Sequence, residues 1–131
     1  MTDNEKVIEA RKKLDTIVAK AVIGQVEGRN RIKRSLKANQ SSDVLLKHVA
    51  TLMRFEQLVK LTDGLQRCIV GMNQDQAVLF LRERLSVTIE QTLLSSKKLT
   101  PMQLTFVNEC TMLALRELYA DIQKIIKELE S

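Results

Sequence analysis

The sequence contains little of what a β-sheet protein needs. Only four glycines and one proline occur in 131 residues, whereas sheet proteins change direction at a turn every ~8–12 residues. Aromatic residues make up 3% of the chain, and tryptophan does not occur. The apolar share of 44% is still large enough for a packed core. These values predict one all-α domain that spans residues 1–131.

Cysteine and long apolar runs are also scarce. Cys68 and Cys110 are too few for a disulfide framework, and we expect both to be buried thiols in a reducing compartment. The longest apolar runs have four or five residues, too short to cross a membrane. The N-terminal residues lack the apolar centre of a secretory signal. The expected location is therefore cytoplasmic.

The residue types that carry most enzymatic chemistry are sparse. His48 is the only histidine, and the Glu-x-x-His pairs that hold two metal ions in helical bundles do not occur. We find no glycine-rich phosphate-binding loop and no nucleophile with an adjacent base. The sequence predicts no catalytic residues, no metal site and no cofactor, so we expect a protein that is not an enzyme.

Apolar residues recur at helical spacing in four segments, approximately residues 4–38, 43–70, 74–95 and 101–130. Residues suited to cap a helix precede the segments: Thr2 or Asp3, Ser41 or Ser42, Asn73 with Gln76, and Thr100 followed by Pro101. The links between the segments are short, which makes neighbouring helices antiparallel. The pattern therefore predicts an up-down-up-down bundle of four long helices.

The first segment keeps a single helical phase from Val7 to Leu36, which favours one long helix. Gly24 and Gly28 argue for a break, because each costs ~1 kcal/mol inside a helix. They are consistent either with a kink or with a close approach of a neighbouring helix.

Several helices carry a second apolar stripe, opposite the stripe expected to form the core. The members of these outer stripes are the candidate partner-binding residues: Leu46, Met53, Leu61, Phe80, Val87, Leu94, Met102, Phe106 and Leu113. They could simply widen the core. They could also bind a second copy of the chain or the amphipathic helix of a protein partner.

Positive charge is concentrated near the end of the first helical segment. Residues 1–40 hold ten Lys and Arg and five Asp and Glu, so they account for the whole net charge of +5. Five of these bases lie between residues 29 and 37, without an acid. The candidate anion-binding residues are Arg11, Arg29, Lys33, Arg34 and Lys37. Three interpretations are open. These residues could form a solvated helix end, could contact nucleic-acid phosphates, or could contact an acidic protein or an anionic membrane surface.

These observations favour a non-catalytic interaction or adaptor module that self-associates or docks a partner helix through its apolar outer stripes. The alternative is a nucleic-acid-associated accessory protein that binds phosphates through residues 29–37.

Overall fold

The computed structural model describes residues 2–96 and 101–131, without the side chains of residues 88–89, 91–96 and 101–108. Its helices are α1 (Asp3–Lys37), α2 (Ser42–Thr62), α3 (Leu65–Cys68), α4 (Gln74–Ser96) and α5 (Pro101–Glu130). No strand occurs in the described part of the chain, and the prediction of an all-α fold is confirmed. None of the described helices combines the length and hydrophobicity that a bilayer crossing requires.

The first helix is continuous for 35 residues, as its unbroken phase predicts. Its first turn is fixed by a capping box, in which the Thr2 hydroxyl accepts from the Glu5 backbone N–H and the Glu5 carboxylate accepts from the Thr2 N–H, both at 3.2 Å. Gly24 and Gly28 do not break α1. They lie directly against Phe55 and Leu52 of α2, so close approach of two helices explains both glycines.

The prediction of one helix over residues 43–70 is wrong, because the helix ends at Thr62. Gly64 adopts a left-handed conformation with φ of +76°, which an α-helix does not allow and which glycine adopts at little cost. The chain then forms the single turn α3. The Thr62 hydroxyl, buried at the end of α2, donates to the Leu58 carbonyl oxygen at 2.6 Å.

The two remaining long helices begin where the sequence predicts. Before α4, the Asn73 Oδ1 atom accepts from the Gln76 N–H at 2.8 Å, and Gln76 Oε1 accepts from the Asn73 N–H at 3.1 Å. This reciprocal pair is a capping box. Helix α5 begins at Pro101, while the expected cap Thr100 lies outside the described residues.

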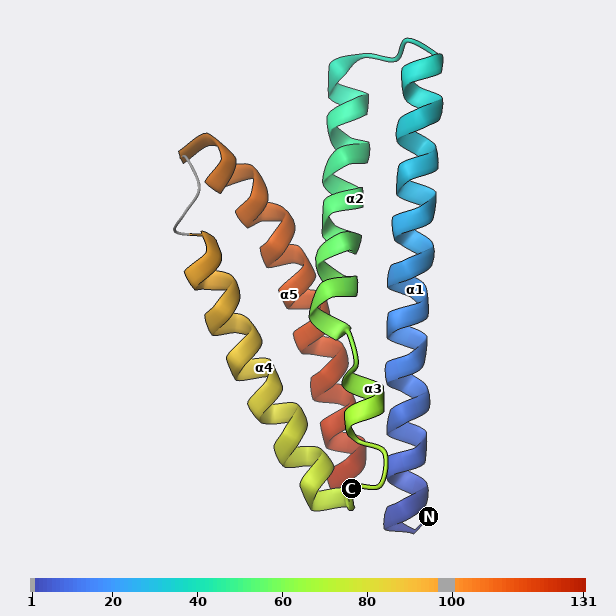
Figure 1. Ribbon diagram of the computed structural model, residues 1–131, viewed down its shortest axis with the longest axis vertical. Coiled ribbons are helices and arrows are strands. Elements are labelled where there is room, and N and C mark those ends of the chain that lie inside the picture. Colours follow the sequence, from blue (N-terminus) through green and yellow to red (C-terminus); the bar gives the residue numbers. More distant parts are fainter. Residues whose placement is uncertain (1, 97–100) are drawn as a thin grey trace.

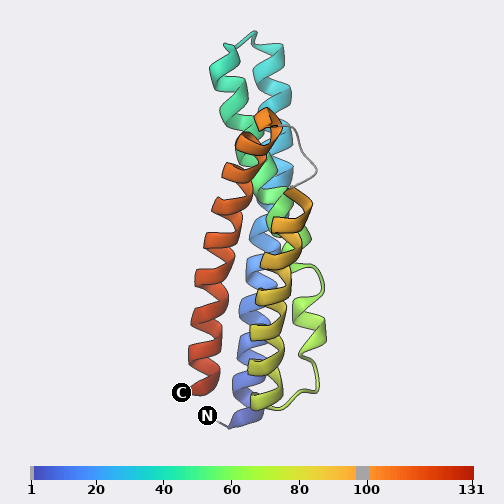
Figure 2. The same cartoon turned by 90° about the vertical axis from the view of Figure 1, so that its left-hand side faces the viewer.

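Figure 1 shows the four long helices alternating in direction, with both ends of the chain at the same end of the molecule. Helix α1 contacts α2, α3, α4 and α5, and α5 also contacts α2 and α4. The α1–α2 hairpin extends beyond α4 and α5 in both views (Figures 1 and 2). Because α4 and α5 diverge from this hairpin in Figure 1, the regular four-helix bundle remains a prediction.

The most deeply buried side chains lie toward the end that holds the termini. They come from the first half of α1, from α3 and its C-cap, and from the first half of α4 and second half of α5: Leu14, Leu65, Ile69, Leu81, Leu118, Ile122, Ile126 and Leu129. Each such burial contributes roughly 1.5–3 kcal/mol. In the protruding part of the hairpin, apolar side chains such as Val44 and Leu46 of α2 stay exposed. The buried core is therefore concentrated at the end that holds the termini, whereas exposed aliphatic side chains occur at both ends, with Ile8 and Leu79 exposed beside the core.

Candidate functional site

The predicted outer stripes are partly exposed. Leu46, Val87 and Leu113 are exposed, whereas Met53, Leu61 and Phe80 are half-buried. Leu61 and Phe80 also pack against the core. The side chains of Leu94, Met102 and Phe106 lie outside those that the structure describes. The predicted stripes on α4 and α5 therefore face outward at Val87 and at Leu113. Met112 and Tyr119 of α5 are also exposed.

The structure adds an apolar surface that the sequence analysis missed, on the outer side of α1. Val22, Ile23 and Val26 are exposed to 42%, 56% and 51%. At 100° per residue they point away from the side of α1 that holds Ala21, Gly24 and Gly28, which are buried. The i, i+1, i+4 spacing of the three residues is visible in the sequence, but outer stripes were expected only on the later helices.

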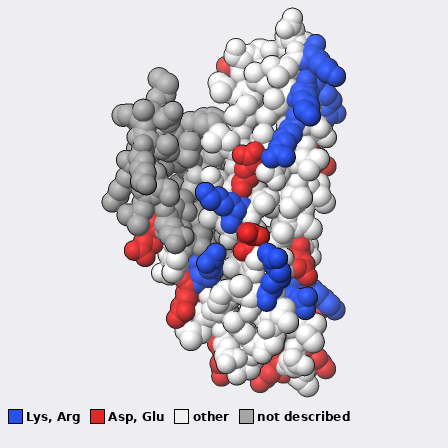
Figure 3. All heavy atoms as spheres, viewed as in Figure 1, with Lys and Arg blue, Asp and Glu red and all other residues white. Residues whose placement is uncertain are grey.

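The predicted basic residues are all exposed. Arg29, Lys33, Arg34 and Lys37, which we call the basic ridge, lie on the last third of α1, and Arg11 lies two and a half heptads earlier. Figure 3 shows Lys and Arg side chains gathered along this upper part of the molecule. Arg29 Nη2 lies 3.8 Å from Glu56 Oε1 of α2. Among the described residues, no ion pair involves Lys33, Arg34 or Lys37.

One prediction beside the basic ridge is wrong. The single helical phase from Val7 to Leu36 places Leu36 in the core stripe, but Leu36 is 61% exposed. Gly28, Ile32 and Leu36 are separated by two steps of four residues, and each step turns about 40° past one full helical turn. The stripe therefore leaves the core side, and Ser35 takes the buried position instead. The Ser35 hydroxyl donates to Gln40 Oε1 at 2.6 Å.

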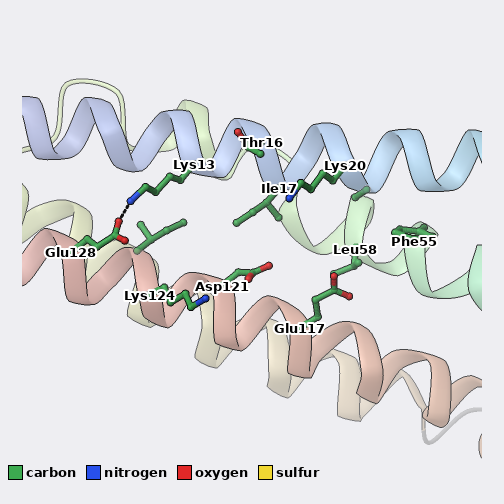
Figure 4. A pocket seen from close by; sticks show the side chains of 12 residues that line it. Lys13, Thr16, Ile17, Lys20, Phe55, Leu58, Glu117, Asp121, Lys124 and Glu128 are labelled. Carbon is green, nitrogen blue, oxygen red and sulfur yellow. Dashed lines mark hydrogen bonds and ion pairs between the residues drawn. The ribbon is translucent and has the colours of Figure 1, made fainter.

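A cleft of about 470 Å³ lies between α1, α2 and α5. Its floor is apolar, with Ile17, Ala21, Phe55, Leu58 and Ile125. Its rims carry charge: Lys13, Lys20, Glu117, Asp121, Lys124 and Glu128. Figure 4 shows Lys20 of α1, and Glu117 and Asp121 of α5, turned toward the space between the helices. Lys13 and Glu128 form an ion pair across one end. Equal numbers of acids and bases make the cleft neutral overall.

The two cysteines and the histidine differ in how deeply they are buried. Cys110 is buried as expected, and burial raises the pKa of its thiol, with a further contribution from the neighbouring Glu109 carboxylate. Cys68 was also expected to be buried, but it is exposed, because the break at Gly64 separates it from the phase of α2. His48 is half-buried. Among the described residues, no three His, Cys, Asp or Glu side chains are grouped to hold a metal ion.

Comparison with protein-family models, with curated proteins and with solved structures finds no match for this chain. The function must therefore be inferred from the exposed surfaces of the protein.

Proposed function

We propose that this protein is a non-catalytic helical interaction module that docks a helix of a protein partner. The observation that carries the proposal is the apolar surface formed by Val22, Ile23 and Val26 on the outer side of α1. Exposed aliphatic side chains that adjoin one another on a helix mark interaction sites more often than isolated ones do. Val87 and Leu113 offer further apolar contacts on α4 and α5.

A photo-crosslinking residue tests this proposal directly. We place it at Ile23 and, as a matched control, at Lys60, which is exposed on α2. In cells of the source organism, position 23 is expected to give a discrete protein adduct that position 60 does not give. Val22→Asp with Val26→Asp should abolish the adduct. If position 23 gives no adduct beyond that of the control, the interaction-module proposal is wrong.

Self-association is the second form of the same proposal, and light scattering distinguishes it. A dimer at micromolar concentration that dissociates with Val87→Asp or Leu113→Asp would identify a second copy as a partner. A monomeric mass, unaffected by both substitutions, would leave only a heterologous partner.

Both cysteines are free thiols, one of them exposed, which supports a reducing, cytoplasmic location for this interaction.

Binding to nucleic acid is the alternative function, and the exposure of the basic ridge favours it. Phosphate contacts by Lys and Arg weaken steeply as salt increases. A mobility shift that disappears at high salt, and that Lys33→Glu with Lys37→Glu abolishes, would support this alternative. Absence of any shift at low salt would exclude it.

A further inference from the structure

The apolar surface and the basic ridge lie on the same side of α1. At 100° per residue, Val22, Val26, Arg29, Lys33 and Lys37 fall within an arc of about 80°, and Ile23 lies about 40° beyond this arc. From Val22 to Lys37 the rise is about 22 Å. The outer α1 surface, as we call these six residues together, is thus a strip with an apolar first half and a basic second half.

The basic half lacks compensation by acids of the chain itself. Arg29, Lys33 and Lys37 follow one another at intervals of four residues, and like charges at this spacing on a helix repel each other. Only Arg29 has a carboxylate within ion-pair distance among the described residues, that of Glu56 at 3.8 Å. A partner that brings carboxylates to Lys33 and Lys37 would replace this repulsion with attraction.

We propose that the outer α1 surface binds an acidic amphipathic helix, with aliphatic residues against its apolar half and Asp or Glu residues against Arg29, Lys33 and Lys37. The inference rests on the proposed function, because it names the chemistry of the partner. Helices that lie along one another bind through apolar residues three and four apart. Complementary charges then fix their direction and register.

A second copy of the chain fits this surface less well. Antiparallel pairing of two α1 helices about Gly24 sets Val22 against Val26 of the second copy. The same pairing sets Arg29, Lys33 and Lys37 against Ala19, Asp15 and Arg11 of the second copy, so only Lys33 meets a carboxylate and Lys37 meets another base.

An anionic membrane also fits less well. Helices that lie in a membrane surface anchor themselves with large apolar and aromatic residues, and α1 contains no aromatic residue. Nucleic-acid phosphates would use the basic ridge but leave Val22, Ile23 and Val26 uncovered. An acidic protein helix is the occupant that uses both halves of the strip.

Two designed helical peptides of the same length test the inference. Both carry Leu at spacing three and four in one half, and the other half carries three Glu in the first peptide and three Gln in the second. We expect fluorescence anisotropy to show binding of the Glu peptide about tenfold tighter at about 50 mM salt. This difference should shrink at about 500 mM salt, where the charges are screened.

Variants of the protein test the contribution of each half of the outer α1 surface to peptide binding. Lys33→Glu with Lys37→Glu should remove the preference for the Glu peptide and leave binding of the Gln peptide unchanged. Ile23→Ser with Val26→Ser should weaken both peptides. Lys47→Glu with Lys60→Glu is the matched control, since both lysines are exposed on α2 and the change in net charge is the same. Circular dichroism checks that each variant is folded.

The outcomes separate the two proposals. Equal binding of both peptides overturns the acidic-partner inference but leaves the interaction module standing. If neither peptide binds and position 23 gives no adduct, both proposals are overturned. The acidic-partner inference is also overturned if a short DNA or RNA duplex, or phosphatidylserine vesicles, bind more tightly than the Glu peptide. In that case this binding would be unaffected by Ile23→Ser with Val26→Ser.

Discussion

Gly24 of α1 and the ring of Phe55 of α2 lie so close that no side chain fits between them. A Cβ atom at position 24 would lie 2.5 Å from Phe55 Cδ1, well inside van der Waals contact. Phe55 is half-buried and forms part of the cleft floor. The spacing of α1 and α2 therefore depends on glycine at this position.

The first prediction concerns this contact. Gly24→Ala gains about 1 kcal/mol of helix propensity but incurs an overpacking cost of about 1–3 kcal/mol. We expect urea denaturation to show a net loss of about 1 kcal/mol in the free energy of unfolding. Phe55→Leu in the same chain should recover part of the loss, since residues in contact do not act additively. Asn30→Ala, exposed on α1, is the control and should be slightly stabilising; a similar gain for Gly24→Ala would contradict the close contact.

The second prediction separates two leucines of the same helical stripe. Leu14 is 1% exposed and Leu36 is 61% exposed. Leu14→Ala is expected to lower the free energy of unfolding by about 2–5 kcal/mol because it leaves a cavity. Leu36→Ala should change it by no more than about 0.5 kcal/mol. Equal losses in thermal or urea unfolding would show that the stripe stays in the core up to its end.

The third prediction concerns the break between α2 and α3. A residue with a Cβ atom pays about 1–2 kcal/mol in the left-handed conformation of Gly64, so Gly64→Ala should be destabilising by that amount. Asn adopts this conformation more readily than other residues, and Gly64→Asn should therefore lose less. The opposite order of the two variants in chemical denaturation would mean that the chain continues as a helix through position 64.

The fourth prediction distinguishes the two thiols by their reactivity. Cys68 is exposed and should react at once with a disulfide reagent in the native protein, whereas Cys110 should react only on unfolding. One fast thiol is expected in the native chain, none in Cys68→Ser and one in Cys110→Ala. Two fast thiols in the native chain would place Cys110 at the surface.

The raised pKa of Cys110 also gives a stability effect with a defined sign. The neutral thiol is favoured in the folded protein, so its contribution is complete at neutral pH. It decreases as the pH rises above the ordinary thiol pKa, where the unfolded chain ionises first. The difference in unfolding free energy between the native chain and Cys110→Ala should therefore shrink in alkaline solution. A difference that is constant with pH would contradict the burial of this thiol.

The helices could be predicted because their signals are local. Thr2 with Glu5 and Asn73 with Gln76 form caps within four residues of chain, and the stripe from Val7 to Gly28 contacts one continuous core. The end of the helix before Gly64 was not predicted, since helical periodicity continues in the sequence through Gln66 and Ile69. Only the backbone conformation at Gly64 shows that the phase is reset there.

The candidate surface could be predicted only in part. The charges of Arg29, Lys33 and Lys37 are visible in the sequence, and charged side chains are almost always exposed. The exposure of Val22, Ile23 and Val26 depends on which helices pack against α1 near these residues. It is therefore decided by the tertiary structure, because an aliphatic side chain is compatible with a buried or an exposed position.

The position of α1 has a further consequence, for the order in which the protein folds. The α1–α2 hairpin closes through the short turn around Asn39, so its contacts are near in sequence. The ion pair of Lys13 with Glu128 joins residues that are 115 positions apart. Contacts between distant residues form late, because closing a longer loop costs more entropy. We expect the hairpin to form first and to serve as the template on which α5 completes the core, so that substitutions at Ile125 accelerate unfolding more than they slow folding.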